Sequence, residues 1–280
     1  MEISEESKKL HNVINYNCTK STRTFFRRIS DVLDWESQDI ELLMDVGCGT
    51  GERSTRQLWF CYPGASQIIA IDSRSKMITE AEDFHQHSNV KFVVADIADW
   101  SSLREWEGQV SHMVSLRYLN FVYNHKIAFD NIFRLLKPGG EAALLFPVAS
   151  DAYEFILKVT KSQIWKPYFT DTFIAPESYE NDWNEEHYEE LLTDVGFTVK
   201  HISLESETFS YATEEQFKED IRSSLAQTIP TELKEKFVED ILEMYYIYYG
   251  EKGNNGPLNL DYYYISCFLK KPEFVIAAFL

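Results

Sequence analysis

Short apolar runs that end in glycine or aspartate dominate the chain between positions 41 and 146. Five of them follow one another: ELLMDVGCGTG, QIIAID, VKFVVADI, VSHMVSL and EAALLF. Runs that are apolar on both faces are typical of strands buried in a parallel sheet. Because the segments between them, such as 75–84 and 128–136, are compatible with helices, the pattern predicts an alternating β/α open sheet.

Helical patterns flank this region on both sides. Before it, apolar residues share one face of a helix expected over 16–35, which we interpret as a covering helix. The residues of that face are Phe25, Phe26, Ile29, Val32 and Leu33. After it, the expected order is a helix over 150–171, a helix over 185–194, a strand over 197–205, two helices over 213–250 and a final strand over 260–271.

Capping signals support the two late helices. Thr213 and Gln216 form a capping box that opens the first of them, and Pro230 with Thr231 marks the start of the second. The expected division of the chain is therefore a covering helix (1–40), an α/β core (41–150), a helical cap segment (151–196), a core strand (197–212), a helical cap insertion (213–258), a final core strand (259–272) and a hydrophobic tail (273–280).

Composition and charge narrow the class of protein. The 280 residues carry 27 Lys and Arg against 45 Asp and Glu, a net charge of −18 that disfavours nucleic acid and anionic membranes as partners. No window reaches the ~20 apolar residues of a membrane span, and the mixed charge of the first ten residues does not fit a secretory signal. The 4 cysteines lack C-x-x-C spacing, so a disulfide framework and a structural zinc site are not expected. We expect a cytoplasmic protein.

The stretch MDVGCGTGER, over 44–53, is the most informative local motif. Gly47, Gly49 and Gly51 follow an apolar strand and allow the backbone to turn tightly and approach a ligand. Their spacing is neither the G-x-G-x-x-G of dinucleotide sites nor a phosphate loop ending in Gly-Lys-Ser/Thr. Asp45, two residues before the first glycine, suits a ligand with a cationic centre better than a pyrophosphate.

Two further acids end the next two strands. Asp72 follows Gly51 by 21 residues and is placed to accept hydrogen bonds from both ribose hydroxyls. Asp96 is placed to accept a hydrogen bond from an adenine amino group, while Ile97 covers the ring. The three acids and the glycine turn all lie at carboxyl ends of strands, where open α/β sheets bind ligands.

These motifs resemble those of class I S-adenosylmethionine (SAM)-dependent methyltransferases. The family's D-x-G-x-G-x-G loop, ribose acid, adenine-edge acid and LLKPGG turn match 45–51, Asp72, Asp96 and 135–140. The resemblance implies SAM as cofactor, S-adenosylhomocysteine as product, and a seven-stranded, mostly parallel Rossmann-like sheet with a reversed final hairpin and a helical cap inserted around the last strands. The candidate cofactor-binding residues are Asp45, Gly47, Cys48, Gly49, Gly51, Asp72, Ser73, Met77, Asp96, Ile97 and Ser115.

The expected acceptor segment is SLRYLNFVY, over 115–123, which contains no His and no carboxylate. A phenol or an amine must lose a proton before attack, whereas a carboxylic acid is already ionised at neutral pH and needs no base. Arg117, Tyr118 and Asn120 supply donors, and the intervening apolar residues suit an amphiphilic acid. The alternative is a surface ion pair for Arg117 and ordinary core packing for Tyr118 and Phe121.

A second resemblance, to the arthropod juvenile hormone acid O-methyltransferases, extends over most of 8–272. It is carried by FDNIFRLLKPGGEAALLF, the aromatic segment 165–173, LLTDVGFTV, the helices over 213–249 and the YYYISCFLKKP ending. It implies carboxyl O-methylation of farnesoic acid or juvenile hormone acids, a step of juvenile hormone biosynthesis. The family usually has Gln on the first helix and a His-Trp pair after the fourth strand, where this chain has Cys18, beside Asn17, and Asn120 with Phe121.

The acceptor-positioning candidates are thus Asn17, Cys18, Arg117, Tyr118, Asn120 and Phe121. The candidate lining of an apolar substrate pocket is Trp165, Tyr168, Phe169, Phe173 and the aromatic cluster 245–249, for which packing between cap and sheet is the alternative. We expect no metal, because His85 and His87 lack further ligands, and a monomer or homodimer. Two other functions remain open: methylation of another small acceptor (an amine, phenol or enolate), and SAM binding without turnover by a partner protein.

Overall fold

The computed structural model describes residues 24–85, 87–169, 176–226, 229–250 and 257–273. They group into two compact units. The first, which we call the core unit, contains the described residues of 19–147, 182–205 and 264–280. The second, the helical unit, contains the described residues of 148–181 and 206–263. All of the expected tail (273–280) except Glu273 lies outside the described residues.

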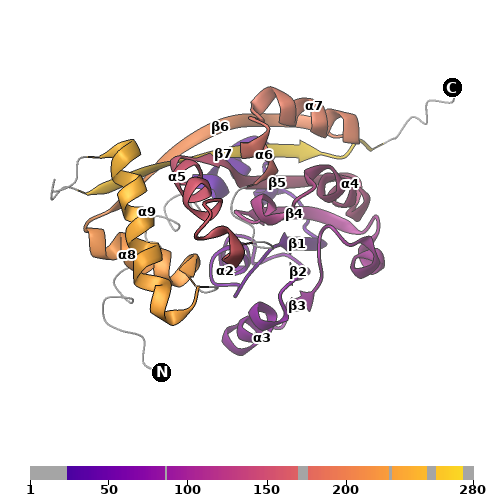
Figure 1. Cartoon of the computed structure of the whole chain (residues 1–280). Coiled ribbons are helices and arrows are strands. Elements are labelled where there is room, and N and C mark those ends of the chain that lie inside the picture. Colours follow the sequence, from indigo (N-terminus) through magenta and orange to yellow (C-terminus); the bar gives the residue numbers. More distant parts are fainter. Residues whose placement is uncertain (1–23, 86, 170–175, 227–228, 251–256, 274–280) are drawn as a thin grey trace. The chain divides into compact units, whose positions relative to one another are not determined.

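A seven-stranded sheet runs in the order β3-β2-β1-β4-β5-β7-β6 (Figure 1). The strands are β1 (Leu42–Val46), β2 (Gln67–Asp72), β3 (Val90–Val94), β4 (Val110–Leu116), β5 (Leu136–Ser150), β6 (Thr198–Tyr211) and β7 (Leu258–Lys270). β1 pairs in parallel with β2 and β4, β2 with β3, and β4 with β5. This confirms the α/β, mostly parallel sheet predicted from the apolar runs.

The final strand runs in the opposite direction to β5. Lys271, just after β7, exchanges backbone hydrogen bonds with Gly139 and Gly140 near the start of β5. At its other end, the backbone N–H of Asp261 donates to the carboxylate of Asp151, just after the end of β5, at 3.1 Å. The reversed final strand that the resemblance implied is therefore present.

The helices alternate with the strands in the first half of the chain and cluster in the second. Those of the core unit are α2 (Ser54–Cys61), α3 (Ser75–Phe84), α4 (His125–Leu135) and α7 (Glu185–Val195), with residues 24–33 also helical. Those of the helical unit are α5 (Asp151–Thr160), α6 (Glu177–Glu180), α8 (Glu214–Ser224) and α9 (Lys234–Tyr249). Short 3₁₀ turns lie at Trp35–Ser37, Trp100–Ser102, Arg104–Trp106, Leu119–Phe121, Lys166–Tyr168 and Thr231–Leu233.

The expected covering helix buries four of the five predicted apolar residues. Phe25, Phe26, Ile29 and Leu33 are all buried, and the Phe25 ring stacks on Phe268 at 5.9 Å. The prediction for Val32 is wrong, because its side chain is 39% exposed. Val32 lies three residues after Ile29 and one before Leu33, so sequence spacing alone does not exclude it from the buried face.

The helix predicted over 150–171 is too long. α5 ends at Thr160, and a separate 3₁₀ turn follows at Lys166–Tyr168. Pro167 lies inside that turn, and proline disfavours helical geometry at the residue before it and removes a backbone donor. The second late helix also begins differently, since Thr231–Leu233 forms a 3₁₀ turn before α9 starts at Lys234.

Helices α5, α8 and α9 share one aromatic-rich core in the helical unit. Phe155, Phe217, Phe237 and Tyr245 are all buried in it. Phe217 packs with Tyr245 at a ring-centroid distance of 5.5 Å and with Phe155 at 6.4 Å. Burial of such large side chains contributes on the order of 2 kcal/mol each, so this cluster is sufficient to hold the three helices together.

The capping signal at Thr213 is confirmed, with one change. The Thr213 hydroxyl accepts a hydrogen bond from the backbone N–H of Gln216 at 3.2 Å. The Gln216 side chain accepts in return from the backbone N–H of Ala212 at 2.9 Å, one residue before the N-cap. Both bonds satisfy donors near the start of α8 that the helix itself leaves unpaired.

We expect Thr213→Ala to lower the free energy of unfolding by about 1 kcal/mol, because the substitution removes the N-cap acceptor of α8. Thr213→Ser is the matched control, since it keeps the hydroxyl. Urea unfolding followed by circular dichroism measures both variants. An equal loss in the two would show that the methyl group of Thr213, and not its hydroxyl, carries the effect.

Candidate functional site

The glycine loop after β1 is tied to the end of β2. The two strands pair in register, with Val46 opposite Ile71. The backbone N–H groups of Gly47 and Cys48 both donate to the Ile71 carbonyl, at 2.8 and 2.9 Å. Because the carboxyl ends of parallel strands share one edge of the sheet, this tie brings the loop beside Asp72.

Asp72 is enclosed by donors. Its side chain has no exposed surface, and one carboxylate oxygen accepts the backbone N–H of Gly49 at 3.0 Å. The other oxygen accepts the backbone N–H and Nε of Arg74, at 3.0 and 3.1 Å. Sequence reasoning did not single out Arg74, since a basic residue two positions after an acid is too common to mark a site.

Asp45 is fully buried beneath the same loop. The hydroxyls of Ser54 and Thr55 donate to its Oδ2, at 2.7 and 2.5 Å. Burial raises the pKa of Asp45 to about 6, although these two hydrogen bonds oppose the shift. Its Oδ1 is also buried and has no hydrogen-bond partner among the described residues. An unsatisfied acceptor that prefers a positive neighbour fits the cationic part of SAM.

Glycine is required at two positions of the loop. Gly47 has a positive φ of 76°, and a Cβ placed there would lie 1.9 Å from Cγ of Tyr118. Gly51 has a φ of 75°, and its Cβ would lie 3.0 Å from both His85 and Phe92. Nothing in the sequence indicates that His85 packs against the loop, since Gly51 and His85 are 34 positions apart in the chain.

Cys48 is a buried loop residue. Burial raises the pKa of its thiol above the ordinary range, and the nearby Asp45 and Asp72 act in the same direction. A thiol held protonated in this way is a poor nucleophile. Its Sγ lies 3.4 Å from the carbonyl of Gly49.

The third strand ends in a tight turn around Asp96, which is half-buried. Its Oδ1 accepts the backbone N–H of Ala98 at 2.9 Å. Ile97 is fully buried, and its carbonyl accepts the side-chain amide of Asn131 at 2.7 Å. Asn131, on α4, is a second site neighbour that the sequence did not indicate.

The remaining cofactor candidates differ in exposure. Ser73 is exposed at the end of β2, and Met77 is half-buried in the first turn of α3. Ser115 is fully buried in β4, where its hydroxyl donates to the carbonyl of Val46 at 3.0 Å. The structure therefore uses the Ser115 side chain to join β4 to β1.

The acceptor candidates after β4 occupy different environments. Arg117 has a positive φ of 57° and donates to the hydroxyl of Tyr264 at 3.0 Å, with its guanidinium over the ring at 4.6 Å. Asn120 is 95% buried, and its Oδ1 has no hydrogen-bond partner among the described residues. Phe121 is 62% exposed. Asn17 and Cys18 lie outside the described residues.

The candidate pocket aromatics lie in the helical unit. Trp165 and Phe169 are buried and pack on Phe237, with ring centroids 5.1 and 5.3 Å apart. The Trp165 indole N–H donates to Asp240 at 2.8 Å. Tyr168 is half-buried, and Phe173 lies outside the described residues. Trp165 also lines a cavity of about 360 Å³ together with Lys158, Ile164 and Met244.

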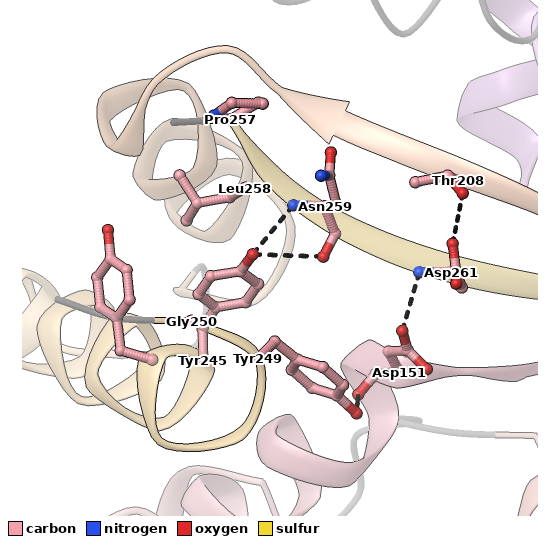
Figure 2. A pocket seen from close by; sticks show the side chains of 10 residues that line it. Asp151, Thr208, Tyr245, Tyr249, Gly250, Pro257, Leu258, Asn259 and Asp261 are labelled. Carbon is pink, nitrogen blue, oxygen red and sulfur yellow. Dashed lines mark hydrogen bonds between the residues drawn. The ribbon is translucent and has the colours of Figure 1, made fainter. Parts of the chain in front are cut away.

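A second cavity of the helical unit has a volume of about 440 Å³ and is lined by residues of the 245–249 cluster (Figure 2). Tyr245 bonds the backbone N–H of Asn259 at 3.0 Å, and the hydroxyl of Tyr249 donates to the carbonyl of Asp151 at 3.2 Å. Asp261 lies beside them and accepts the Thr208 hydroxyl at 2.5 Å. Asp151 and Asp261 both line this cavity, and their negative charges make it unsuited to a carboxylate ligand.

Within residues 24–85, 87–169, 176–226, 229–250 and 257–273, no group of three or more His, Cys, Asp or Glu side chains is arranged to hold a metal ion. None of the helices within the described ranges is long and apolar enough to cross a membrane.

The chain is similar in sequence to known methyltransferases. Residues 43–140 match the family model of a methyltransferase domain. Over 261 residues the chain is 28% identical to a juvenile hormone acid O-methyltransferase of Drosophila melanogaster, covering 90% of this chain and 88% of the relative. A second one, from Bombyx mori, is 22% identical over 204 residues, or 72% of this chain and 73% of the relative.

The fold is shared with solved structures. The YcgJ protein of Bacillus subtilis superposes with a TM-score of 0.61 at 15% identity, covering 90% of this chain and 99% of that one. The domain match includes Asp45, Asp72 and Asp96, and the seven-stranded sheet has the reversed final strand that the resemblance implied. The domain match, the similarity to these relatives and the shared fold together support a class I SAM-dependent methyltransferase.

Proposed function

We propose that this enzyme transfers the methyl group of SAM to the carboxylate of a small lipophilic acid of the farnesoic acid or juvenile hormone acid type. The observation that carries the proposal is the similarity to two juvenile hormone acid O-methyltransferases, which extends over 90% and 72% of the chain. Similarity of this extent includes the segments after 146, beyond the methyltransferase domain match at 43–140.

The chemistry of the acceptor segment supports a carboxylate. In the reaction, a carboxylate oxygen attacks the methyl carbon while the carbon–sulfur bond breaks and its electron pair stays on sulfur. The products are a methyl ester and S-adenosylhomocysteine, and no proton is transferred. An enzyme for this reaction needs to hold the two reactants in line in a dry site, and the absence of His and carboxylate from 115–123 agrees with that need.

We propose that Asn120 orients the acceptor carboxylate. Its amide is buried, and an amide nitrogen donates well to a carboxylate oxygen. Phe121 retains an aromatic ring beside it but has no N–H to donate. The orphaned Oδ1 of Asn120 would accept from a donor that arrives with the reactants.

The cofactor would be held by the glycine loop and the three acids. We propose that Asp72 accepts the ribose hydroxyls, Asp96 the adenine amino group, and that Asp45 provides negative charge near the cationic methionine part. The backbone of 47–51 would approach the same part of the ligand. The remaining candidates, Ser73, Met77, Ile97 and Ser115, would contribute contacts and support.

The decisive experiment is transfer of isotopically labelled methyl from SAM to farnesoic acid, followed by extraction of the ester. We expect labelled methyl farnesoate. Folded protein that binds S-adenosylhomocysteine but forms no ester would overturn the acceptor assignment. A panel of amines and phenols, with product identity by mass spectrometry, then separates another acceptor from a protein that binds SAM without turnover.

Asp72→Ala should weaken the binding of S-adenosylhomocysteine by ~1 to 3 kcal/mol, because the ribose hydroxyls lose a charged acceptor. Calorimetric titration measures the affinity. Asp83→Ala, which removes an exposed acid from α3, is the matched control and should bind as the wild type does. Equal affinity of the Asp72 variant and the wild type would contradict the assigned role.

The affinity for SAM should rise with pH between about 5 and 7. The pKa of Asp45 is raised to about 6 in the folded protein, so its carboxyl is mostly protonated below that pH and mostly ionised above it. Only the ionised form attracts a cation, and SAM binding should therefore release protons near pH 6. Titrations at several pH values test this, and Asp45→Asn should remove the dependence. A slope that persists in this variant would assign the effect to another group.

A further inference from the structure

Asp72, to which we assign the ribose hydroxyls, is not accessible to a ligand in this structure. The Asp72 side chain has no exposed surface, and hydrogen bonds from Gly49 and Arg74 occupy both carboxylate oxygens. A ribose bound through two hydroxyls needs direct access to these oxygens. Some part of the site must therefore move before Asp72 can perform that role.

Tyr118 lies across the same edge of the sheet. Its side chain starts directly on the backbone of Gly47, where an added Cβ would be only 1.9 Å from its Cγ. Its phenol shares a hydrogen bond with Ser73, and Asp72, Asp96 and Arg74 are near enough to influence its ionisation. The ring thus extends from the end of β1 to the residue after β2, between the two points that SAM would bridge.

We propose that Tyr118 is a gate of the cofactor site, which must swing away before SAM binds. The proposal rests on the assignment of Asp72 and the glycine loop to the cofactor, and not on the identity of the methyl acceptor. Tyr118 is 91% buried, so the closed position is a packed one and not a surface rotamer. Both the ring contact with Gly47 and the bond to Ser73 are lost when it opens.

The residue before Tyr118 provides a hinge. Arg117 has a φ of 57°, in the left-handed region that residues with a Cβ rarely adopt. It is held there by its backbone N–H, which donates to the Leu145 carbonyl at 2.6 Å, and by the contact of its guanidinium with Tyr264. A change of φ at this one residue to the ordinary negative range would redirect the Tyr118 side chain.

The gate has a kinetic consequence that a fixed wall does not have. If S-adenosylhomocysteine binds only the open form, the observed binding rate reaches a plateau set by gate opening as the ligand concentration rises. The apparent affinity is also reduced by the open fraction. For an open fraction at or below roughly 10%, removal of the gate strengthens binding by about 10-fold or more.

Stopped-flow tryptophan fluorescence and calorimetry with S-adenosylhomocysteine test the gate without reference to methyl transfer. We expect a rate plateau in the wild type, and in Tyr118→Ala a rate that is linear in ligand concentration with about 10-fold tighter binding. Tyr118→Phe removes only the phenol hydroxyl and its hydrogen bond and should give a higher plateau, which keeps the test available if Tyr118→Ala does not fold. Phe60→Ala, which removes an exposed ring from α2, is the control and should keep the wild-type plateau.

Three results would overturn the gate. A linear rate in the wild type, or binding by Tyr118→Ala that is equal to or weaker than in the wild type, would make Tyr118 a fixed wall of the site. Absence of binding in both proteins, when both are folded, would overturn the cofactor assignment itself. None of these results depends on whether farnesoic acid is the acceptor, so the two proposals fail separately.

Discussion

The tie between the glycine loop and β2 is the constraint on which the site depends. Two backbone N–H groups converge on the carbonyl of Ile71, and a third donates to Asp72. These bonds fix a loop that has three glycines with positive φ and would otherwise have high conformational freedom. They also keep Asp45 and Asp72 buried, and a buried carboxylate depends on the few fixed donors around it. The geometry of the candidate cofactor site is therefore largely set by parallel strand pairing.

Much of this geometry could be predicted because it is local. Each strand of the first half is a short apolar run, and each acid lies within two residues of the end of one, so parallel pairing brings Asp45, Asp72 and Asp96 to one edge. The cap at Thr213 is likewise encoded within four residues. The features that the sequence did not reveal are nonlocal. They are the contact of His85 with Gly51 and the hydrogen bond from Asn131 to the carbonyl of Ile97. The exposure of Val32 also depends on how its helix packs against the rest of the unit.

For Tyr118, the sequence indicated a role from the residue type but did not predict where the side chain lies. Its ring and hydroxyl made it a candidate for the acceptor site, and nothing in SLRYLNFVY indicates that it lies on Gly47. That placement depends on the left-handed backbone of Arg117, a residue type that rarely adopts this conformation and therefore gives no sequence signal. Gly47 is consequently constrained twice, by its own φ and by the ring packed against it.

The aromatic residues of the helical unit do not by themselves identify the methyl acceptor, because many of them stabilise the unit's own core. Trp165 bonds Asp240 and packs on Phe237, so its buried surface cannot be reassigned to a ligand without loss of the core. Of the two cavities described above, the one bordered by Asp151 and Asp261 repels an anion, whereas the one beside Trp165 offers apolar walls at Ile164 and Met244 and the cation of Lys158. Asp240 and Glu243 border the latter as well, so a carboxylate could be held there only close to Lys158. Under the proposed function, Asn120 anchors the carboxyl group instead, in a segment (115–123) that contains no acid to oppose it.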